Sequence, residues 1–159
     1  METVQVINPD VFLETEAGRV WTSERSKRAW ASSFDALEQT LSDANTPDTR
    51  LLIVCGLQGS GNSQWIKDYA QNYAPCVCFD AALPGARHRK PILDMANKYG
   101  AEALAIWIDI PIEIAKQRNL TRQLDKRVPE ESIESVARLF EPPRYDEGFS
   151  EVIRVMTTL

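Results

Sequence analysis

Three glycines and a serine follow a short apolar run, at a spacing that could bind a phosphate group. Leu51 to Cys55 are all apolar, and the chain then reads Gly-Leu-Gln-Gly-Ser-Gly-Asn-Ser. Glycines can turn the backbone with φ > 0, so successive N–H groups can point inward around an anion. A helix beginning near Asn62 would add free amides and a positive dipole end. The sequence therefore predicts a phosphate cradle made by Gly56, Leu57, Gln58, Gly59, Ser60, Gly61, Asn62, Ser63 and Gln64.

One residue of this segment departs from the usual phosphate-binding pattern. The spacing G-x-x-x-x-G-x-S is met, but the position that normally carries lysine holds Asn62. Loss of a lysine charge beside the β- and γ-phosphates typically costs on the order of 3 kcal/mol, or ~10²–10³ in rate. Lys67 lies further round the same helix and points elsewhere. Three explanations stay open: a substitution made or selected in this chain, a natural loss of catalysis, or a cation supplied by another element.

Asp80 stands directly after a second apolar run, Val77 to Phe79. In open parallel sheets, ligands bind beyond the carboxyl ends of the strands. A carboxylate there can hold Mg²⁺ or accept the proton of an attacking hydroxyl group. The hydroxyl of Ser63 occupies the position from which such loops hold Mg²⁺. We therefore predict Ser63 and Asp80 as metal ligands and Asp80 also as a candidate base, the alternative being a turn or capping role for Asp80.

Two sets of basic residues could contact phosphate groups. Arg87 opens the run Arg-His-Arg-Lys shortly after Asp80, and arginine can grip a phosphate with two N–H donors. This run could seat an anionic acceptor, or it could be a charged loop in solvent. Arg118 and Arg122 lie four positions apart, so a helix would present both on one face. A mobile helical lid could bring them to a triphosphate, unless they pair with surface acids such as Glu113 or Asp125.

The elements that must position these residues alternate between strand and helix. Such alternation predicts an α/β domain with a parallel sheet and right-handed crossovers. The apolar runs predict strands at 51–55, 76–79, 103–109 and 152–155, and periodicity and prolines predict helices ending near Tyr73, over 92–99, and starting at Pro111 and Pro129.

The first fifty residues form an extension with a different pattern. Alternating β-type residues up to Trp21 predict a small hairpin. A helix capped by Thr22 or Ser23 follows, and a turn-rich linker covers 43–50. The apolar stripe of this helix consists of Trp30, Phe34, Leu37 and Leu41.

Composition limits the class of protein. The 159 residues are 43% hydrophobic and 26% charged, as in a single globular domain. The net charge of −5 argues against a broad nucleic-acid surface, and no apolar run is long enough for a membrane span. Cys55, Cys76 and Cys78 fall in apolar runs, and His88 is the only histidine, so buried thiols are favoured over a metal site. Without a secretory signal, we expect a cytoplasmic protein.

Several short motifs resemble the polynucleotide-kinase-like branch of the P-loop kinases, AAA-type ATP-binding proteins. They are the loop itself, Gln117–Arg122, Val128–Glu130, Phe140–Pro143 and Glu147–Phe149. The resemblance covers about residues 51–155. It implies a three-layer α/β fold and Mg²⁺-dependent phosphoryl transfer from ATP, or GTP, to a hydroxyl group. It also implies that Arg118 and Arg122 are lid arginines that bind the nucleotide, and that Arg122 acts in catalysis.

The resemblance also exposes a difference. Relatives usually carry a further strand-and-helix unit between the loop and the strand that ends in Asp-Ala-Thr, which Cys78–Ala82 resembles. That unit supplies an acceptor-binding aspartate and arginine, yet here only a short segment separates Ser63 from Cys76. Asp80 and Arg87, near the place of the family's downstream arginine, are candidates to take over its role. Residues 1–50 find no counterpart in the kinase core.

Together these observations predict one three-layer P-loop kinase-like domain over 1–159, with an extension at 1–50, a nucleotide-binding core at 51–159 and a lid near 112–128. The expected function is transfer of the γ-phosphoryl group to a hydroxyl of an anionic acceptor such as a nucleic-acid end, a nucleotide or a phosphorylated metabolite, with Asn62 reducing activity. The alternatives are an inactive nucleotide-binding regulatory module, and an NTPase that hydrolyses nucleotide to drive a conformational change. No glutamate suited to position water stands beside Asp80.

Overall fold

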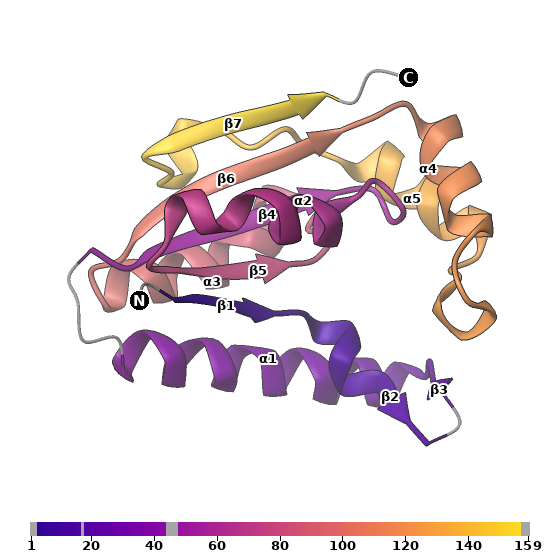
Figure 1. Ribbon diagram of the computed structural model, residues 1–159, viewed down its shortest axis with the longest axis horizontal. Coiled ribbons are helices and arrows are strands. Elements are labelled where there is room, and N and C mark those ends of the chain that lie inside the picture. The colour runs from indigo at the N-terminus through magenta and orange to yellow at the C-terminus, as the bar shows by residue number, and fades with distance from the viewer. Residues whose placement is uncertain (1–2, 17, 44–47, 157–159) are drawn as a thin grey trace.

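A five-stranded parallel sheet forms the centre of the computed structural model, which describes residues 3–16, 18–43 and 48–156 (Figure 1). Every neighbouring pair of its strands is parallel. The predicted α/β fold with a short parallel sheet, consistent with a P-loop NTPase or kinase, is confirmed. In spatial order the strands are β1 (Val4–Ile7), β5 (Cys76–Asp80), β4 (Arg50–Gly56), β6 (Glu102–Asp109) and β7 (Glu151–Met156).

Helices cover both faces of the sheet and produce three layers. One face packs against α1 (Ser23–Asp43) and α3 (Ala86–Lys98). The other packs against α2 (Asn62–Tyr69), η2 (Ala70–Tyr73), α4 (Ile112–Leu120) and α5 (Glu130–Leu139). Three short 3₁₀ helices complete the connections, namely η1 (Pro9–Leu13), η3 (Leu124–Lys126) and η4 (Tyr145–Glu147).

The central strands are apolar throughout because both of their faces are buried. Along β4, Leu51 and Ile53 face α1 and α3, whereas Leu52 and Val54 face α2. Strands buried on two sides read as continuous hydrophobic runs rather than as alternating ones. The predicted stripe of α1 meets this core, and the ring of Phe34 lies 6.2 Å from that of Phe79 on β5.

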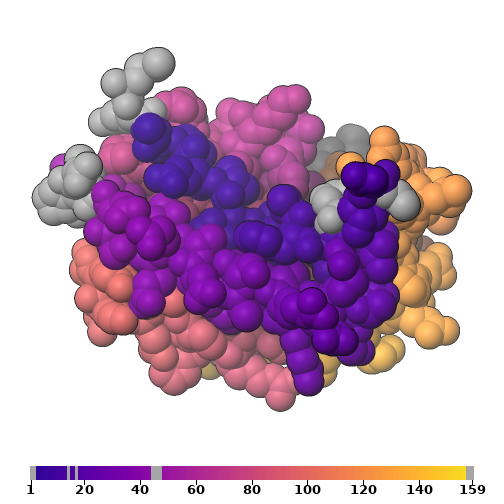
Figure 2. Space-filling model, turned by 90° about the horizontal axis from the view of Figure 1, so that it is seen from below, coloured from indigo at the N-terminus to yellow at the C-terminus, as the bar shows by residue number. Residues whose placement is uncertain are grey.

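The N-terminal segment departs from the predicted hairpin. Its first strand, β1, joins the main sheet beside β5, with Val4 opposite Cys76. The apolar residues after it wind into η1 instead of forming a strand. The hairpin is reduced to two two-residue strands, β2 (Glu14–Thr15) and β3 (Gly18–Arg19). Figure 2 shows these N-terminal residues and α1 as a continuous band across one face of the molecule.

Candidate functional site

The glycine-rich segment forms a tight loop between β4 and α2. Gly59 and Gly61 have φ values of +82° and +107°, a region that other residues rarely adopt. A Cβ atom on Gly59 would lie 2.5 Å from the carbonyl oxygen of Ala115 on α4. The loop therefore needs glycine both for its turns and for the close approach of α4. Helix α2 begins at Asn62, as the sequence predicts, and its first amides face the loop.

A cleft of about 570 Å³ lies over this loop. All predicted cradle residues, 56–64, line it, together with Asp80, Arg118 and Arg122. The structure therefore gathers the loop, the acid after β5 and the two arginines predicted to belong to a lid around one space. Two residues that the sequence reasoning missed, Asn8 and Asp10, also line this cleft.

Asp80 and Ser63 meet at the floor of the cleft. The Ser63 hydroxyl donates a hydrogen bond to Oδ2 of Asp80 at 2.5 Å, and Asn8 Nδ2 donates to the same oxygen at 3.3 Å. Burial raises the pKa of Asp80 above the usual aspartate value, and the bond from Ser63 partly offsets that rise. Nearby charges act in both directions, since Asp10 raises this pKa and Arg122 lowers it.

This hydroxyl–carboxylate pair fits Mg²⁺, which takes few protein oxygens and completes its octahedron with water and phosphate. Among the residues that the structure describes, no group of three or more histidine, cysteine or acidic side chains could hold a metal ion. A nucleotide-bound Mg²⁺ contacted by Ser63 and Asp80 is compatible with this donor set.

Asn62 has a role that the sequence did not indicate. Its Nδ2 donates to the carbonyl oxygens of Val54 and Ala81 at 3.2 and 3.3 Å, which ties the ends of β4 and β5 together. Its Oδ1 accepts a hydrogen bond from the Ser60 hydroxyl at 3.0 Å. Both amide hydrogens are thus engaged by main-chain carbonyls. In this arrangement the side chain braces the underside of the loop and has no donor left for a phosphate.

Arg118 reaches the cleft from α4, whereas Arg122 lies two residues beyond the end of this helix, so the prediction that one helix face carries both arginines is wrong. Nη1 of Arg118 donates to the carbonyl oxygen of Ser60 at 2.9 Å, so this guanidinium rests on the loop itself. Arg122 is half-buried, and burial together with the charge of Arg19 lowers its pKa. Asp125, one acid considered as a surface partner, instead accepts a hydrogen bond from the main-chain N–H of Arg19.

The basic run after Asp80 does not act as one charged patch. Arg89 is fully buried, where its guanidinium pairs with Glu147 at 2.8 Å and donates to the carbonyl oxygens of Leu83 and Glu141. His88 Nδ1 accepts a hydrogen bond from the Gly85 main chain, and Lys90 pairs with an acid one turn away.

Arg87, the remaining cation to which the structure gives no such role, is exposed and does not line the cleft over the loop. Its contact with an acceptor stays a prediction.

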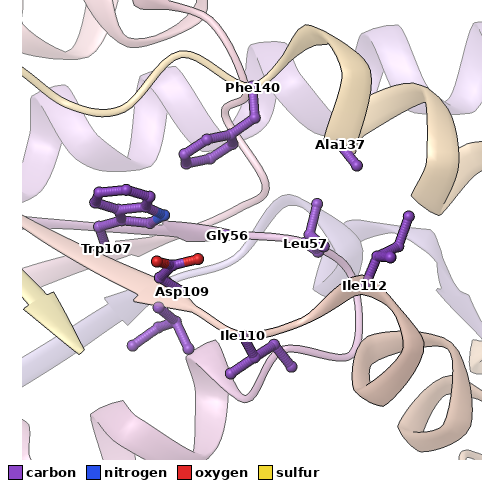
Figure 3. A pocket seen from close by; sticks show the side chains of 9 residues that line it. Gly56, Leu57, Trp107, Asp109, Ile110, Ile112, Ala137 and Phe140 are labelled. Atoms are coloured by element: carbon purple, nitrogen blue, oxygen red, sulfur yellow. The ribbon is translucent and has the colours of Figure 1, made fainter. Parts of the chain in front are cut away.

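A second, smaller pocket shares Gly56 and Leu57 with this cleft (Figure 3). Its volume is about 210 Å³, and its walls are mainly apolar, with Leu57, Trp107 and Phe140 facing one another. The rings of Trp107 and Phe140 stack with centroids 5.7 Å apart. Asp109 is its charged member, and it accepts a hydrogen bond from Arg154 Nε at 2.8 Å.

Comparison with known families supports a broad assignment of this domain. A family model described as an AAA domain matches residues 66–143, slightly less than half of the chain. The match begins within α2, just after the loop, and contains Asp80, Arg118 and Arg122. No curated protein matches the chain. None of the described helices combines the length and apolar character needed to cross a bilayer. The fold and this match together indicate a nucleotide-binding, kinase-like P-loop domain.

Proposed function

We propose that this P-loop domain binds ATP or GTP over the loop and transfers the γ-phosphoryl group to a hydroxyl group. The observation that carries the proposal is the bond from Arg118 to the carbonyl oxygen of Ser60, because it rests a lid cation on the loop that lacks the usual lysine. The second lid arginine lines the same cleft. Cations aimed at the place where charge develops are the main means of accelerating phosphoryl transfer.

The position of Arg118 supports one explanation for Asn62. A guanidinium can take over the charge that a loop lysine supplies, and its planar donors suit phosphate oxygens. Asn62 is then free to brace the strand ends, which it does through two main-chain carbonyls. The missing lysine therefore does not by itself argue against phosphoryl transfer.

Ser63 and Asp80 are the residues that would hold Mg²⁺ on the bound nucleotide. The metal would neutralise charge on the β- and γ-phosphate oxygens. The chain's own contribution is to fix this pair at the loop, through the 2.5 Å bond between them and the bond from Asn8. Arg122 would face the transferring group from the lid, where its half-buried charge is only weakly screened.

The basic run at 87–90 supports an anionic acceptor less than the sequence suggested. Arg89 is committed to Glu147, and His88 to the cap of α3. Arg87 is exposed and does not line the cleft, so its contact with an anionic acceptor stays a prediction.

The second candidate function is a nucleotide-binding module without turnover. It is favoured by the hydrogen bonds of Asn62. They show that the residue at the position of the usual lysine has a structural role. The two functions share nucleotide binding and differ in product formation.

Calorimetric titration with ATP and GTP, with and without Mg²⁺, tests binding, and release of the nucleoside diphosphate tests transfer. Arg118→Ala and Arg122→Ala should each weaken nucleotide binding by about tenfold or more, because each removes a charge-assisted contact. The matched control is Arg138→Ala on α5, an exposed arginine outside the cleft. Absence of nucleotide binding in both the unsubstituted chain and Asn62→Lys would exclude both functions. Binding without turnover in both would favour the regulatory module.

A further inference from the structure

We propose that the N-terminal segment forms the acceptor half of this cleft, with Asp10 as the group that accepts the proton of the attacking hydroxyl, and that the acceptor is an uncharged hydroxyl compound such as a nucleoside or a sugar. The inference rests on the proposed phosphoryl transfer and specifies its second substrate.

The register of β1 brings this segment to the site. Ile7 pairs with Phe79, so the residue that follows β1 emerges beside the end of β5, where Asp80 stands. The carboxyl ends of parallel strands share one edge of the sheet, and ligands bind there. Asn8 and Asp10 accordingly line the cleft together with the loop, although they precede it by almost fifty positions.

Local hydrogen bonds hold the segment in this position. Asn8 donates from Nδ2 to Asp80 at 3.3 Å, and its Oδ1 accepts a bond from the main-chain N–H of Asp10 at 2.9 Å. This turn fixes the backbone of Asp10 relative to the floor of the cleft. On the far side, the Asp10 carboxylate lies 3.7 Å from Nη1 of Arg19, which limits its orientation further.

The two carboxylates of the cleft differ in what they can do. Asp80 is buried, and one of its oxygens already accepts bonds from Ser63 and Asn8. The Asp10 side chain is 40% exposed, so it can meet an incoming hydroxyl and later return a proton to solvent. A general base must be accessible to the substrate hydroxyl and must be able to exchange its proton with solvent. The geometry therefore assigns a holding role to Asp80 and proton acceptance to Asp10.

The step balances with these groups alone. The acceptor oxygen forms a bond to the γ-phosphorus, and the bond between that phosphorus and the β–γ bridging oxygen breaks. The electron pair stays on the bridging oxygen, so the nucleoside diphosphate leaves. The hydroxyl proton passes to the carboxylate of Asp10 and then to water.

The charge of this half of the cleft sets the class of acceptor. Asn8, Asp10 and Asp80 contribute one amide and two carboxylates. Two cations lie near these carboxylates: Arg19 faces Asp10, and Arg122, whose charge interacts with both, is the group proposed for the transferring phosphoryl group. Carboxylates accept hydrogen bonds from hydroxyl groups and repel anions, and the amide can accept or donate a hydrogen bond. A neutral compound with hydroxyl groups therefore fits this wall better than a phosphorylated one.

The test uses the full chain, labelled [γ-³²P]ATP and two acceptor mixtures. One mixture is uncharged (adenosine, glucose and glycerol), and the other is anionic (nucleoside 3′-monophosphates and a 5′-hydroxyl oligonucleotide). The unsubstituted chain and Asn62→Lys are assayed first. Asp10→Asn and Asp10→Glu are then introduced into whichever of these two proteins is active. The matched control is Asp35→Asn, an exposed aspartate of α1 outside the cleft. Binding of a non-hydrolysable ATP analogue is titrated in parallel, and thermal unfolding checks that each variant folds.

We expect transfer to the uncharged mixture. Asp10→Asn should lower kcat by ~10²-fold and leave affinity for the analogue within about twofold, since the lost base acts only in transfer. Asp10→Glu should retain part of the activity, and Asp35→Asn all of it. Transfer that is unaffected by Asp10→Asn, or confined to the anionic mixture, overturns this inference alone. Bound nucleotide without transfer to either mixture, or no bound nucleotide, overturns the proposed function as well.

Discussion

The indole Nε1 of Trp21 donates a hydrogen bond at 2.8 Å to the carbonyl oxygen of Asp125, so the N-terminal segment is joined to the segment predicted to be a lid (112–128). A second bond, from the main-chain N–H of Arg19 to the Asp125 carboxylate, supports the same contact at 2.8 Å. Arg25 in turn holds the segment to α1 by donating to the carbonyl oxygens of Leu13 and Val20. Figure 2 shows the N-terminal residues lying against the lid.

This contact predicts that Trp21→Phe releases the lid while keeping most of the ring. Loss of one hydrogen bond of about 1 kcal/mol should speed nucleotide dissociation roughly fivefold, because the lid opens more often. Stopped-flow displacement of a fluorescent ATP analogue measures this rate. Tyr145→Phe, which removes one exposed polar group from η4, is the control. An unchanged dissociation rate in Trp21→Phe would mean that the bond does not restrain the lid.

The bonds of Asn62 predict opposite effects of one substitution on binding and stability. Asn62→Lys adds a charge at the phosphates and should tighten nucleotide binding by about tenfold or more. It also removes the links to Val54 and Ala81, at about 1 kcal/mol each, so the melting temperature should fall. Asn62→Ala should lower the melting temperature similarly without the gain in affinity. Equal affinity in the lysine and alanine variants would contradict the charge argument.

The buried pair of Arg89 and Glu147 predicts a large loss of stability. Arg89→Met leaves the Glu147 carboxylate without its partner in a largely buried place, and breaking such a pair typically costs about 3–5 kcal/mol. Urea unfolding measures the change. The double variant Arg89→Met with Glu147→Leu should recover part of the loss, since no buried charge remains. Full additivity of the two single losses would show that the pair does not interact.

His88 predicts a dependence of stability on pH. Burial, followed by the charges of Arg87 and Arg89, lowers its pKa in the folded state, and Nδ1 must be unprotonated to accept the bond from Gly85. The unfolded chain therefore binds the proton first, so stability is complete above the ordinary histidine pKa of about 6.5 and declines as the pH falls below it.

Melting temperatures between neutral and mildly acidic pH, compared with those of His88→Gln, check this dependence. Because His88 is the only histidine, its proton NMR titration gives the pKa directly. Arg87→Ala should raise that pKa, since a nearby positive charge is removed. An identical pH dependence in the glutamine variant would assign the effect to other groups.

Local patterns were sufficient for the core of the fold and for the loop. Continuous apolar runs marked the strands that are buried on both faces, and the spacing of the glycines marked the turn. The spacing of Arg118 and Arg122 predicted two cations on one face of a helix. Both line the cleft, but α4 ends at Leu120, so Arg122 lies beyond the helix. Each of these signals lies within one short stretch, so the sequence contains it directly.

Features that depend on distant partners were not predictable in this way. Arg89 stands among charged neighbours and resembles a surface residue, because the glutamate that allows its burial is 58 positions away. The membership of β1 in the sheet depends on β5 and not on its own four residues, most of which are not buried. Consequently Asn8 and Asp10, polar residues after an unremarkable strand, gave no sign that they line the cleft.

The pairing of β1 with β5 also affects the order in which the elements of this protein can fold during synthesis. Val4 must wait for Cys76 to be synthesised before it has a neighbour in the sheet. Until then the apolar stripe of α1 also lacks Phe79 of β5, against which Phe34 packs. Contacts between distant positions form slowly because a long loop must close first. We therefore expect the wall that holds Asp10 to be assembled late, after the nascent chain has passed the loop.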